Sequence, residues 1–222
     1  MISNKRYTIE TTRVPVTMLP DVFLNQLGVF THRGLLTPAE CRAWWQHAAR
    51  KKGRPGTVNR GGQSVQDDSV RRVREVDLES EEKDRFNAQI EPIRQNLEHY
   101  FGVALGPLGE QQCLLYEAGD HFALHSDSVK FKGGRVTNKH RRFISVLVFL
   151  NTPGDHDVPY EGGELAIYGL MNVPGGDDQG FIVEPEQGKV VAFRSNQMHA
   201  VSPVLSGHRY VIAGCFHDLT VG

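Results

Sequence analysis

Apolar residues recur at helical spacing in two segments of the first half of the chain. Thr37 can act as an N-cap, Pro38 suits a first helical turn, and Glu40 can complete a capping box, so a helix is predicted from about 38 to 51. A second helix is predicted over 80–100, where apolar residues lie three or four positions apart. Pro92 should kink or restart this second helix, because its ring cannot fit an undisturbed interior turn. Residues 1–36 predict only a loosely ordered lead-in that ends in a strand.

Beyond Gly106 the pattern changes to short apolar runs separated by Gly, Pro, Asn and Asp. Strands are predicted at about 111–117, 121–126, 143–150, 163–168, 181–183, 189–194, 199–204 and 209–216. Helices followed by many short strands favour a mainly β fold, a jelly-roll or barrel buttressed by the N-terminal helices on one face. We therefore expect a single domain over 1–222, with 1–105 as a support region of strand and helices and 106–222 as the β core.

Two long segments, 53–69 and 130–142, show no periodicity that could bury one face. The first is rich in Gly, Asn, Gln, Ser and Asp, and the second is basic. Both are predicted to be loops, and loops of this length often act as lids or binding loops. Because segment 130–142 follows the candidate site described below, one hypothesis is that it closes over an anionic or carboxylate-bearing substrate. Its basic residues are Lys130, Lys132, Arg135, Lys139, Arg141 and Arg142.

Composition narrows the class of protein. Of 222 residues, 39% are hydrophobic and 23% are charged, which is typical of a soluble globular protein with a sizeable core. A formal net charge of -1 disfavours capture of nucleic acid or an anionic membrane by the whole molecule, and we expect neither partner. Cys41, Cys113 and Cys215 are widely spaced, which favours neither a disulfide framework nor a thiolate zinc site, so a reducing, cytoplasmic location is expected.

Three residues could form a metal site. His125 and Asp127 lie two positions apart, so on an extended chain both side chains point to one face. His199, just after a predicted buried strand, would supply a third ligand. Two His and one carboxylate suit non-haem Fe(II), because they hold one face of an octahedron and leave three positions open. Zinc accepts the same ligands, so this set alone does not fix the metal.

Arg209 lies ten residues beyond His199, at the start of an otherwise apolar strand. A tight connection between them would bring Arg209 back close to His199 in space. Its planar guanidinium could bind a carboxylate held at a fixed distance from the metal. Tyr116, on the strand before His125, could add a hydrogen bond to the same carboxylate, although a buried Tyr is also common in cores.

From about Gln112 to Phe216 the chain resembles the Fe(II)- and 2-oxoglutarate-dependent oxygenases, particularly the prolyl 4-hydroxylase-like branch. The resemblance rests on a series of short motifs in the same order and at similar spacings. They are Leu114–Gly119, His125-Ser-Asp127, Arg142–Asn151, Gly162-Gly-Glu-Leu165, Pro185–Phe193, His199–Val204 and Gly207-His-Arg209. Collagen-type prolyl hydroxylases have Lys where this chain has Arg209, so the resemblance is to the oxygen-sensing and bacterial members and does not imply a collagen substrate.

The resemblance implies a double-stranded β-helix with iron on His125, Asp127 and His199, and 2-oxoglutarate bound by Arg209 and Tyr116. It implies Fe(II), 2-oxoglutarate and O2 as cofactor and cosubstrates, with ascorbate as a further candidate. The expected activity is hydroxylation of an aliphatic C–H, in a prolyl residue of a protein or peptide or in a free amino acid. Two alternatives stay open: a cupin-like metal enzyme that does not use 2-oxoglutarate, and a non-catalytic jelly-roll binding module.

Overall fold

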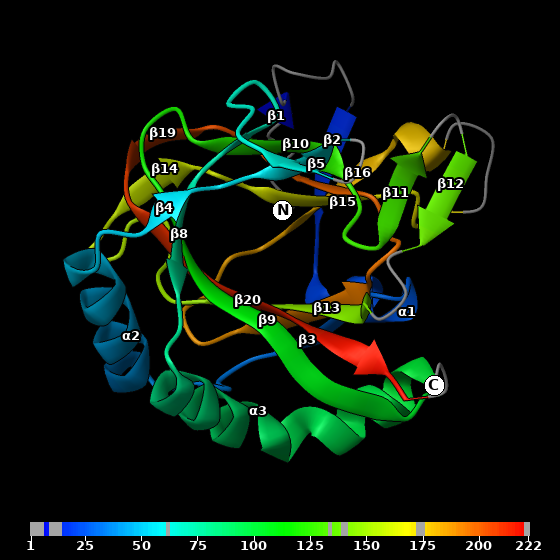
Figure 1. Cartoon of the computed structure of the whole chain (residues 1–222), viewed down its shortest axis with the longest axis horizontal. Helices are drawn as coiled ribbons and strands as arrows, with labels where there is room; N and C mark the ends of the chain where they lie inside the picture. The colour runs from blue at the N-terminus through cyan, green and yellow to red at the C-terminus, as the bar shows by residue number, and fades with distance from the viewer. Residues whose placement is uncertain are drawn as a thin grey trace.

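Two seven-stranded sheets face each other across an apolar interior (Figure 1). The computed structural model describes residues 7–8, 15–60, 63–132, 135–138, 142–171 and 176–219. The first sheet has the order β1 (Tyr7–Thr8), β2 (Pro15–Leu19), β16 (Gly180–Val183), β15 (Leu165–Tyr168), β18 (His199–Val201), β10 (His121–His125) and β7 (Arg71–Arg72). The second has the order β3 (Phe30–His32), β17 (Val190–Arg194), β13 (Arg142–Phe149), β20 (Arg209–Asp218), β9 (Leu105–Tyr116), β8 (Arg74–Asp77) and β4 (Arg54–Pro55).

Alternation along the strands of the second sheet divides the core into two layers. In β13, Leu147 and Phe149 point into the space between the sheets, whereas Val146 and Val148 pack against the helices. Period-two alternation produces this division, because successive side chains of a strand point to opposite faces. The helices thus cover one face of the second sheet, and the interior between the sheets is left for the site (Figure 1).

The covering helices are α2 (Pro38–Arg50) and α3 (Ser80–Phe101). The predicted capping box begins α2: the Thr37 hydroxyl accepts from the Glu40 backbone N–H, and the Glu40 carboxylate accepts from the Thr37 N–H at 2.8 Å. Helix α3 continues through Pro92 as one element, so of the two predicted alternatives, a kink or a restart, the restart does not occur. A short helix that the pattern did not predict, α1 (Asp21–Gln26), precedes β3.

Each of the eight predicted strands is present, with ends that differ by a few residues, and the mainly β jelly-roll expectation is confirmed. Residues before 106 also extend both sheets, since β2 pairs with β16 and β3 pairs with β17. None of the helices in the described ranges is both long and apolar enough to cross a membrane.

The two segments predicted to be loops contain short strands. Segment 53–69 includes β4 and the hairpin of β5 (Val58–Arg60) and β6 (Gln63–Val65). In segment 130–142, β11 (Val129–Lys132) pairs with β12 (Arg135–Asn138), and residues 133–134 and 139–141 lie outside the described residues. The prediction of purely irregular loops is therefore wrong for the described parts. Strands β4, β5 and β6 are short and mostly exposed, so hydrophobic alternation could not reveal them.

A close approach of two backbone segments fixes the turn before β17. Gly188 has a φ of +78°, and an added Cβ there would lie 2.0 Å from the Leu36 carbonyl oxygen. Gly154 has a similar φ of +74°, but no atom lies within 4 Å of the position of its Cβ. Alanine substitutions of Gly154 and Gly188 therefore separate two costs in the free energy of unfolding. One is the strain of a side chain on left-handed backbone, and the other is steric overlap with a neighbouring backbone atom.

We expect Gly154→Ala to lower the free energy of unfolding by about 1–2 kcal/mol, because a side chain strains left-handed backbone. Gly188→Ala should lower it further by about 1–3 kcal/mol, because it adds overlap with a backbone atom. Urea denaturation of both variants measures the difference. Equal losses in the two variants would contradict the steric account.

Candidate metal centre

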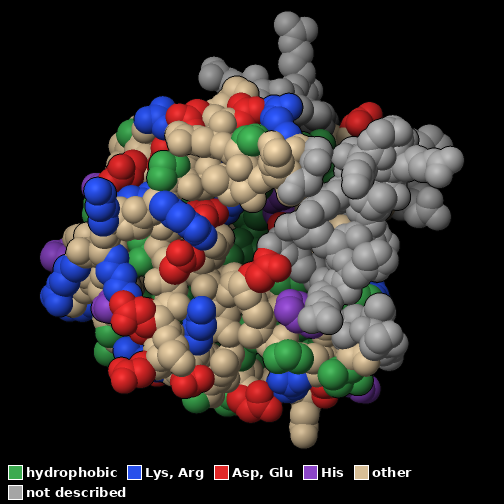
Figure 2. Space-filling view, viewed as in Figure 1, with side chains coloured by type: hydrophobic (Ala, Val, Ile, Leu, Met, Phe, Trp, Pro, Cys, Tyr) green, Lys and Arg blue, Asp and Glu red, His purple; other side chains and the backbone are tan. Residues whose placement is uncertain are grey.

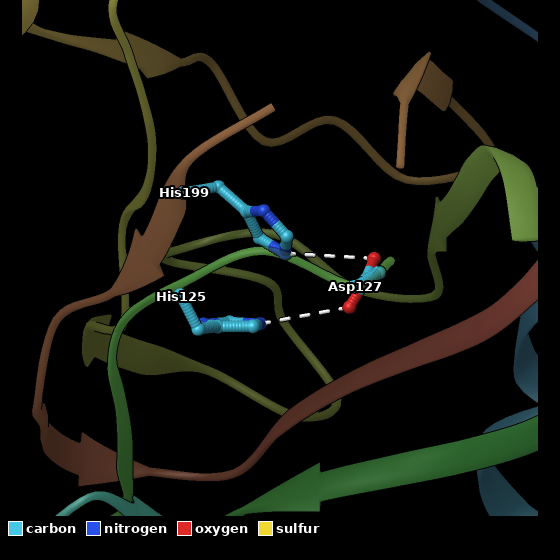
Figure 3. A group of neighbouring side chains, drawn as sticks. All are labelled: His125, Asp127 and His199. Carbon is cyan, nitrogen blue, oxygen red and sulfur yellow. Dashed lines mark ion pairs between the residues drawn. The ribbon is translucent and has the colours of Figure 1, made fainter. Parts of the chain in front are cut away.

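His125 and His199 are brought together by strand register. The two residues are direct cross-strand partners on the antiparallel strands β10 and β18. Asp127 follows the end of β10, where its backbone N–H donates to the Ser195 carbonyl at 2.8 Å. The three side chains converge on one point from these two neighbouring segments (Figure 3).

The potential ligand atoms are close enough for one ion to reach all of them. They lie within 4.8 Å of one another. The Nε2 atom of His125 lies 3.7 Å from Asp127 Oδ1, and the Nε2 atom of His199 lies 3.7 Å from Asp127 Oδ2 (Figure 3). The structure therefore brings together the three residues that the sequence singled out as a metal site.

Hydrogen bonds to backbone carbonyls orient both imidazoles. His125 Nδ1 lies 2.8 Å from the Ala123 carbonyl oxygen, and His199 Nδ1 lies 2.9 Å from that of Gln197. A carbonyl can only accept, so Nδ1 carries the proton in each ring and Nε2 presents its lone pair toward Asp127. This arrangement of a backbone acceptor behind each imidazole is typical of metal-binding His residues.

The electrostatic environment favours the protonation states that metal binding needs. Burial, aided by the neighbouring His199, lowers the pKa of His125 to about 3, so this ring is neutral at pH 7. Burial opposes ionisation of Asp127, but His199, His125 and the Ser145 hydroxyl outweigh it, and the pKa of Asp127 lies below its usual value. A neutral imidazole and an ionised carboxylate are the forms that bind a divalent ion.

Aromatic packing supports the same rings. Phe122 stacks on His125, with ring centroids 3.4 Å apart and an interplanar angle of 13°. The Arg71 guanidinium lies 4.6 Å from the centroid of Phe122, and Phe193 packs 4.7 Å from His199. The two imidazoles are thus held by packing as well as by hydrogen bonds.

Arg209 lies on the second sheet, where register pairs it with Tyr116 of β9. It is fully buried, and its three guanidinium nitrogens have no hydrogen-bond partner within the described part of the chain. Its Cζ lies 5.0 Å from the Tyr116 ring centroid and 5.5 Å from that of Phe149. Gly163, with a φ of +66°, leaves the space that Arg209 needs, because a Cβ there would lie 2.8 Å from Arg209 Cδ.

Tyr160 is a further polar residue of this pocket that the sequence analysis missed. It begins β14 (Tyr160–Gly162), which pairs with β19 (Val204–Gly207), and its buried hydroxyl lies beside the Arg209 guanidinium. Burial raises the pKa of Tyr160 to about 12 against the opposing effect of the Arg209 charge, so the hydroxyl is a donor at neutral pH. Its only signal in the sequence is its place two residues before Gly162-Gly163.

The other histidines among the described residues are not part of this cluster. His208 forms an ion pair with Glu117 at 3.5 Å when protonated, and His121 faces the carbonyls of Gly119 and Ser69. His140 lies outside the described residues.

The face that carries β10 and β15 above β9 and β20 has a recess near its centre, with hydrophobic side chains at its base (Figure 2).

Comparison with known proteins agrees with this geometry. The model of the family described as the 2OG-Fe(II) oxygenase superfamily matches residues 111–217, a range that contains the three clustered residues and Arg209. This match covers just under half of the chain, and over those residues the chain is similar to this superfamily. The similarity implies Fe(II), 2-oxoglutarate and O2, and the donor set of two imidazoles and one carboxylate suits Fe(II).

Proteins similar to this chain include several named PKHD-type hydroxylases. One from Synechococcus sp. is 38% identical over 97 residues, which make up 44% of this chain and 36% of that protein. Another from Crocosphaera subtropica is 33% identical over 104 residues, which make up 47% of this chain and 40% of that protein. The match therefore spans less than half the length of these relatives.

Solved structures show that this chain shares its fold with prolyl hydroxylases. A Pseudomonas putida prolyl-4-hydroxylase aligns with a TM-score of 0.63 and 22% identity, over 88% of this chain and 95% of that chain. A Trichoplax adhaerens prolyl hydroxylase, in complex with a peptide fragment of a hypoxia inducible factor, aligns with a TM-score of 0.62 and 17% identity, over 89% of this chain and 86% of that chain.

We expect His199→Ala to abolish stoichiometric Fe(II) binding, because it removes one of the three residues expected to bind the metal. His121→Ala and His208→Ala should bind Fe(II) as the wild type does, because neither residue belongs to the cluster. Anaerobic titration with Fe(II) under competition from a chelator gives the dissociation constants. Tight binding of one Fe(II) by His199→Ala would refute the ligand assignment.

Proposed function

We propose that this chain is an Fe(II)- and 2-oxoglutarate-dependent dioxygenase that hydroxylates an aliphatic C–H bond. The observation that carries the proposal is that two features lie together in the interior between the two sheets. One is the cluster of His125, Asp127 and His199, and the other is the buried guanidinium of Arg209 with no partner among the described residues. A buried charge is costly unless it is paired, so Arg209 calls for an anionic ligand.

With Fe(II) and 2-oxoglutarate bound, the reaction would be that of the family. One O2 and one 2-oxoglutarate are consumed, the substrate C–H becomes C–OH, and succinate and CO2 are released. The chain supplies binding, orientation and a shielded interior. His125, Asp127 and His199 would hold Fe(II). Arg209 would pair with the far carboxylate of 2-oxoglutarate, and the Tyr160 hydroxyl would donate to the same carboxylate.

Tyr116 contributes to this pocket through its ring and its hydroxyl. The ring covers one face of the Arg209 guanidinium, which restricts the directions in which that fork can donate. Burial raises the pKa of Tyr116, so its hydroxyl also stays protonated and can donate to a carboxylate. Tyr116 and Tyr160 together would make the pocket selective for an acceptor-rich group.

For the substrate we propose a prolyl residue in a protein or peptide, or a free amino acid. Support comes from the relatives named PKHD-type hydroxylases and from the shared fold with prolyl hydroxylases. Arg71 forms an ion pair with Glu75 at 2.5 Å and Arg72 forms one with Asp120 at 3.0 Å, so neither is an unpaired positive charge available to an acidic substrate. The side chains of Arg135 and Arg142 lie outside the described residues, so a role for segment 130–142 in closing over substrate stays a hypothesis.

We further propose that the chain acts as one oxygenase domain in the cytoplasm. Strands β2 and β7 belong to the first sheet, and β3 and β8 belong to the second. Both sheets would be incomplete without these strands, which supports a single unit. Three free, buried cysteines, Cys41, Cys113 and Cys215, are compatible with a reducing compartment.

The test of the proposed function is succinate formation with Fe(II), 2-oxoglutarate and O2 across a panel of prolyl peptides and free amino acids, with and without ascorbate. We expect a member of the panel to raise succinate release above the rate without substrate, with an equal amount of hydroxylated product detected by mass spectrometry. Absence of succinate under every condition, from protein that binds Fe(II), would refute the dioxygenase assignment.

We expect Arg209→Ala to raise the KM for 2-oxoglutarate by roughly 30- to 5,000-fold, because truncating one partner of a buried charge pair costs about 2–5 kcal/mol. Its affinity for Fe(II) should change far less, since Arg209 lies on the other sheet from the two histidines. Steady-state kinetics and metal titration measure the two quantities separately.

Tyr160→Phe serves as the comparison, because it removes one hydroxyl from the same pocket and keeps the ring. It should raise the same KM by a smaller factor. An unchanged KM in Arg209→Ala would remove 2-oxoglutarate from the proposal and favour the cupin-like alternative.

A further inference from the structure

A chain of buried polar groups in hydrogen-bond contact begins at the Asp127 carboxylate and runs along the second sheet. The Ser145 hydroxyl lies 2.5 Å from Asp127 Oδ2 and 2.9 Å from the Ser195 hydroxyl. The Ser195 hydroxyl in turn lies 3.2 Å from Cys215 Sγ. Ser145 and Ser195 are at most 2% exposed and Cys215 is 4% exposed, so bulk water does not compete for these contacts.

The direction of the hydrogen bonds follows from the charge at one end. An ionised carboxylate can only accept, so Ser145 donates its proton to Asp127. Its oxygen is then available as an acceptor, and the Ser195 hydroxyl donates to it. The Cys215 thiol is a weak donor within reach of Ser195. The Ser145 and Ser195 hydroxyls are therefore polarised toward Asp127, whereas the Cys215 thiol lies within reach of both the Ser195 hydroxyl and the Phe216 carbonyl, at 3.2 and 3.4 Å.

Strand register places these residues next to one another. Ser145 on β13 is the direct partner of Cys215 on β20, and Ser195 follows the end of the neighbouring strand β17. Ser145 shares the inward face of β13 with Leu147 and Phe149, so a polar side chain breaks an apolar row. Packing alone would be served by Ala, and a buried hydroxyl is costly unless it is hydrogen-bonded.

The same segment also fixes the backbone of the ligand. The N–H groups of Asp127 and Ser128 both donate to the Ser195 carbonyl, at 2.8 and 2.9 Å. Ser195 therefore holds Asp127 from two sides, through its carbonyl to the backbone and through Ser145 to the carboxylate.

We propose that Ser145, backed by Ser195 and Cys215, is a positioning relay that holds Oδ2 of Asp127 and sets the orientation in which this carboxylate meets the metal. The proposal rests on the proposed function, because it takes Asp127 as an iron ligand. Groups that hydrogen-bond a metal-ligating carboxylate typically contribute 10- to 100-fold to metal affinity. None of the three residues of the relay contacts substrate or cosubstrate in this account.

The experiment is Fe(II) binding by Ser145→Ala, measured anaerobically against a competing chelator and without turnover. We expect the dissociation constant to rise by about 10- to 100-fold. With Co(II) in place of Fe(II), the visible absorption bands of Ser145→Ala should shift relative to the wild type, because the carboxylate ligand has lost its orientation. Ser195→Ala should change both readouts in the same direction and by less, and it serves as the test if Ser145→Ala does not fold.

Ser202→Ala is the matched control. It also removes a buried serine hydroxyl, one that accepts from the Glu164 backbone N–H at 2.8 Å and has no place in the relay. Its thermal stability should fall as in the other variants, with Fe(II) affinity and the Co(II) spectrum as in the wild type. A purely structural role for Ser145 predicts that same result for Ser145→Ala, and this result would overturn the relay.

The outcomes separate the relay from the function on which it rests. Wild-type protein that binds no Fe(II) would overturn both. Wild-type protein that binds Fe(II) and forms succinate, with Ser145→Ala binding equally tightly and giving an unchanged Co(II) spectrum, would overturn the relay alone.

Discussion

An ionised carboxylate held between two imidazoles inside an apolar barrel is the interaction on which the rest of the site depends. Burial raises the pKa of Asp127, whereas the neighbouring His199 and His125 and the Ser145 hydrogen bond lower it, so the pKa lies below its usual value. The cost of burying a charge is offset only where its partners are placed accurately. The backbone supplies that accuracy, since register pairs the two histidines and the Ser195 carbonyl holds the Asp127 N–H.

The site is divided between the two sheets, and this division assigns separate tasks to them. The first sheet provides His125 and His199, whereas the second provides Arg209, its partner Tyr116 and the hydroxyl of Ser145. The distance between metal and carboxylate-binding groups is therefore set by how the sheets pack. Apolar side chains from both sheets fill the space between them, and close packing of such an interior resists small shifts.

Much of this architecture could be predicted from the sequence, for reasons that differ between elements. Helix α2 was predictable because its capping box is a local signal, and the strands of the β core because their residues are buried and apolar. Helix α1 was missed because it is six residues long and has no side-chain N-cap. The trio of ligands could be proposed from residue types and order, but Tyr160 and Ser145 could not, because their roles arise only when register and pairing place them beside Arg209 and Asp127.

The site contains buried charged groups that lower the stability of the fold. Fully buried Arg209, with no hydrogen-bond partner among the described residues, and Asp127 beside two imidazoles are groups that a core selected only for stability would replace with apolar side chains. A divalent ion and a dicarboxylate, the ligands of the proposed function, would be complementary to these charges. Ligands that bind only the folded state stabilise it. The apolar packing around the site therefore offsets the free energy of unfolding that its buried polar groups cost. Bound ligands would raise the free energy of unfolding further.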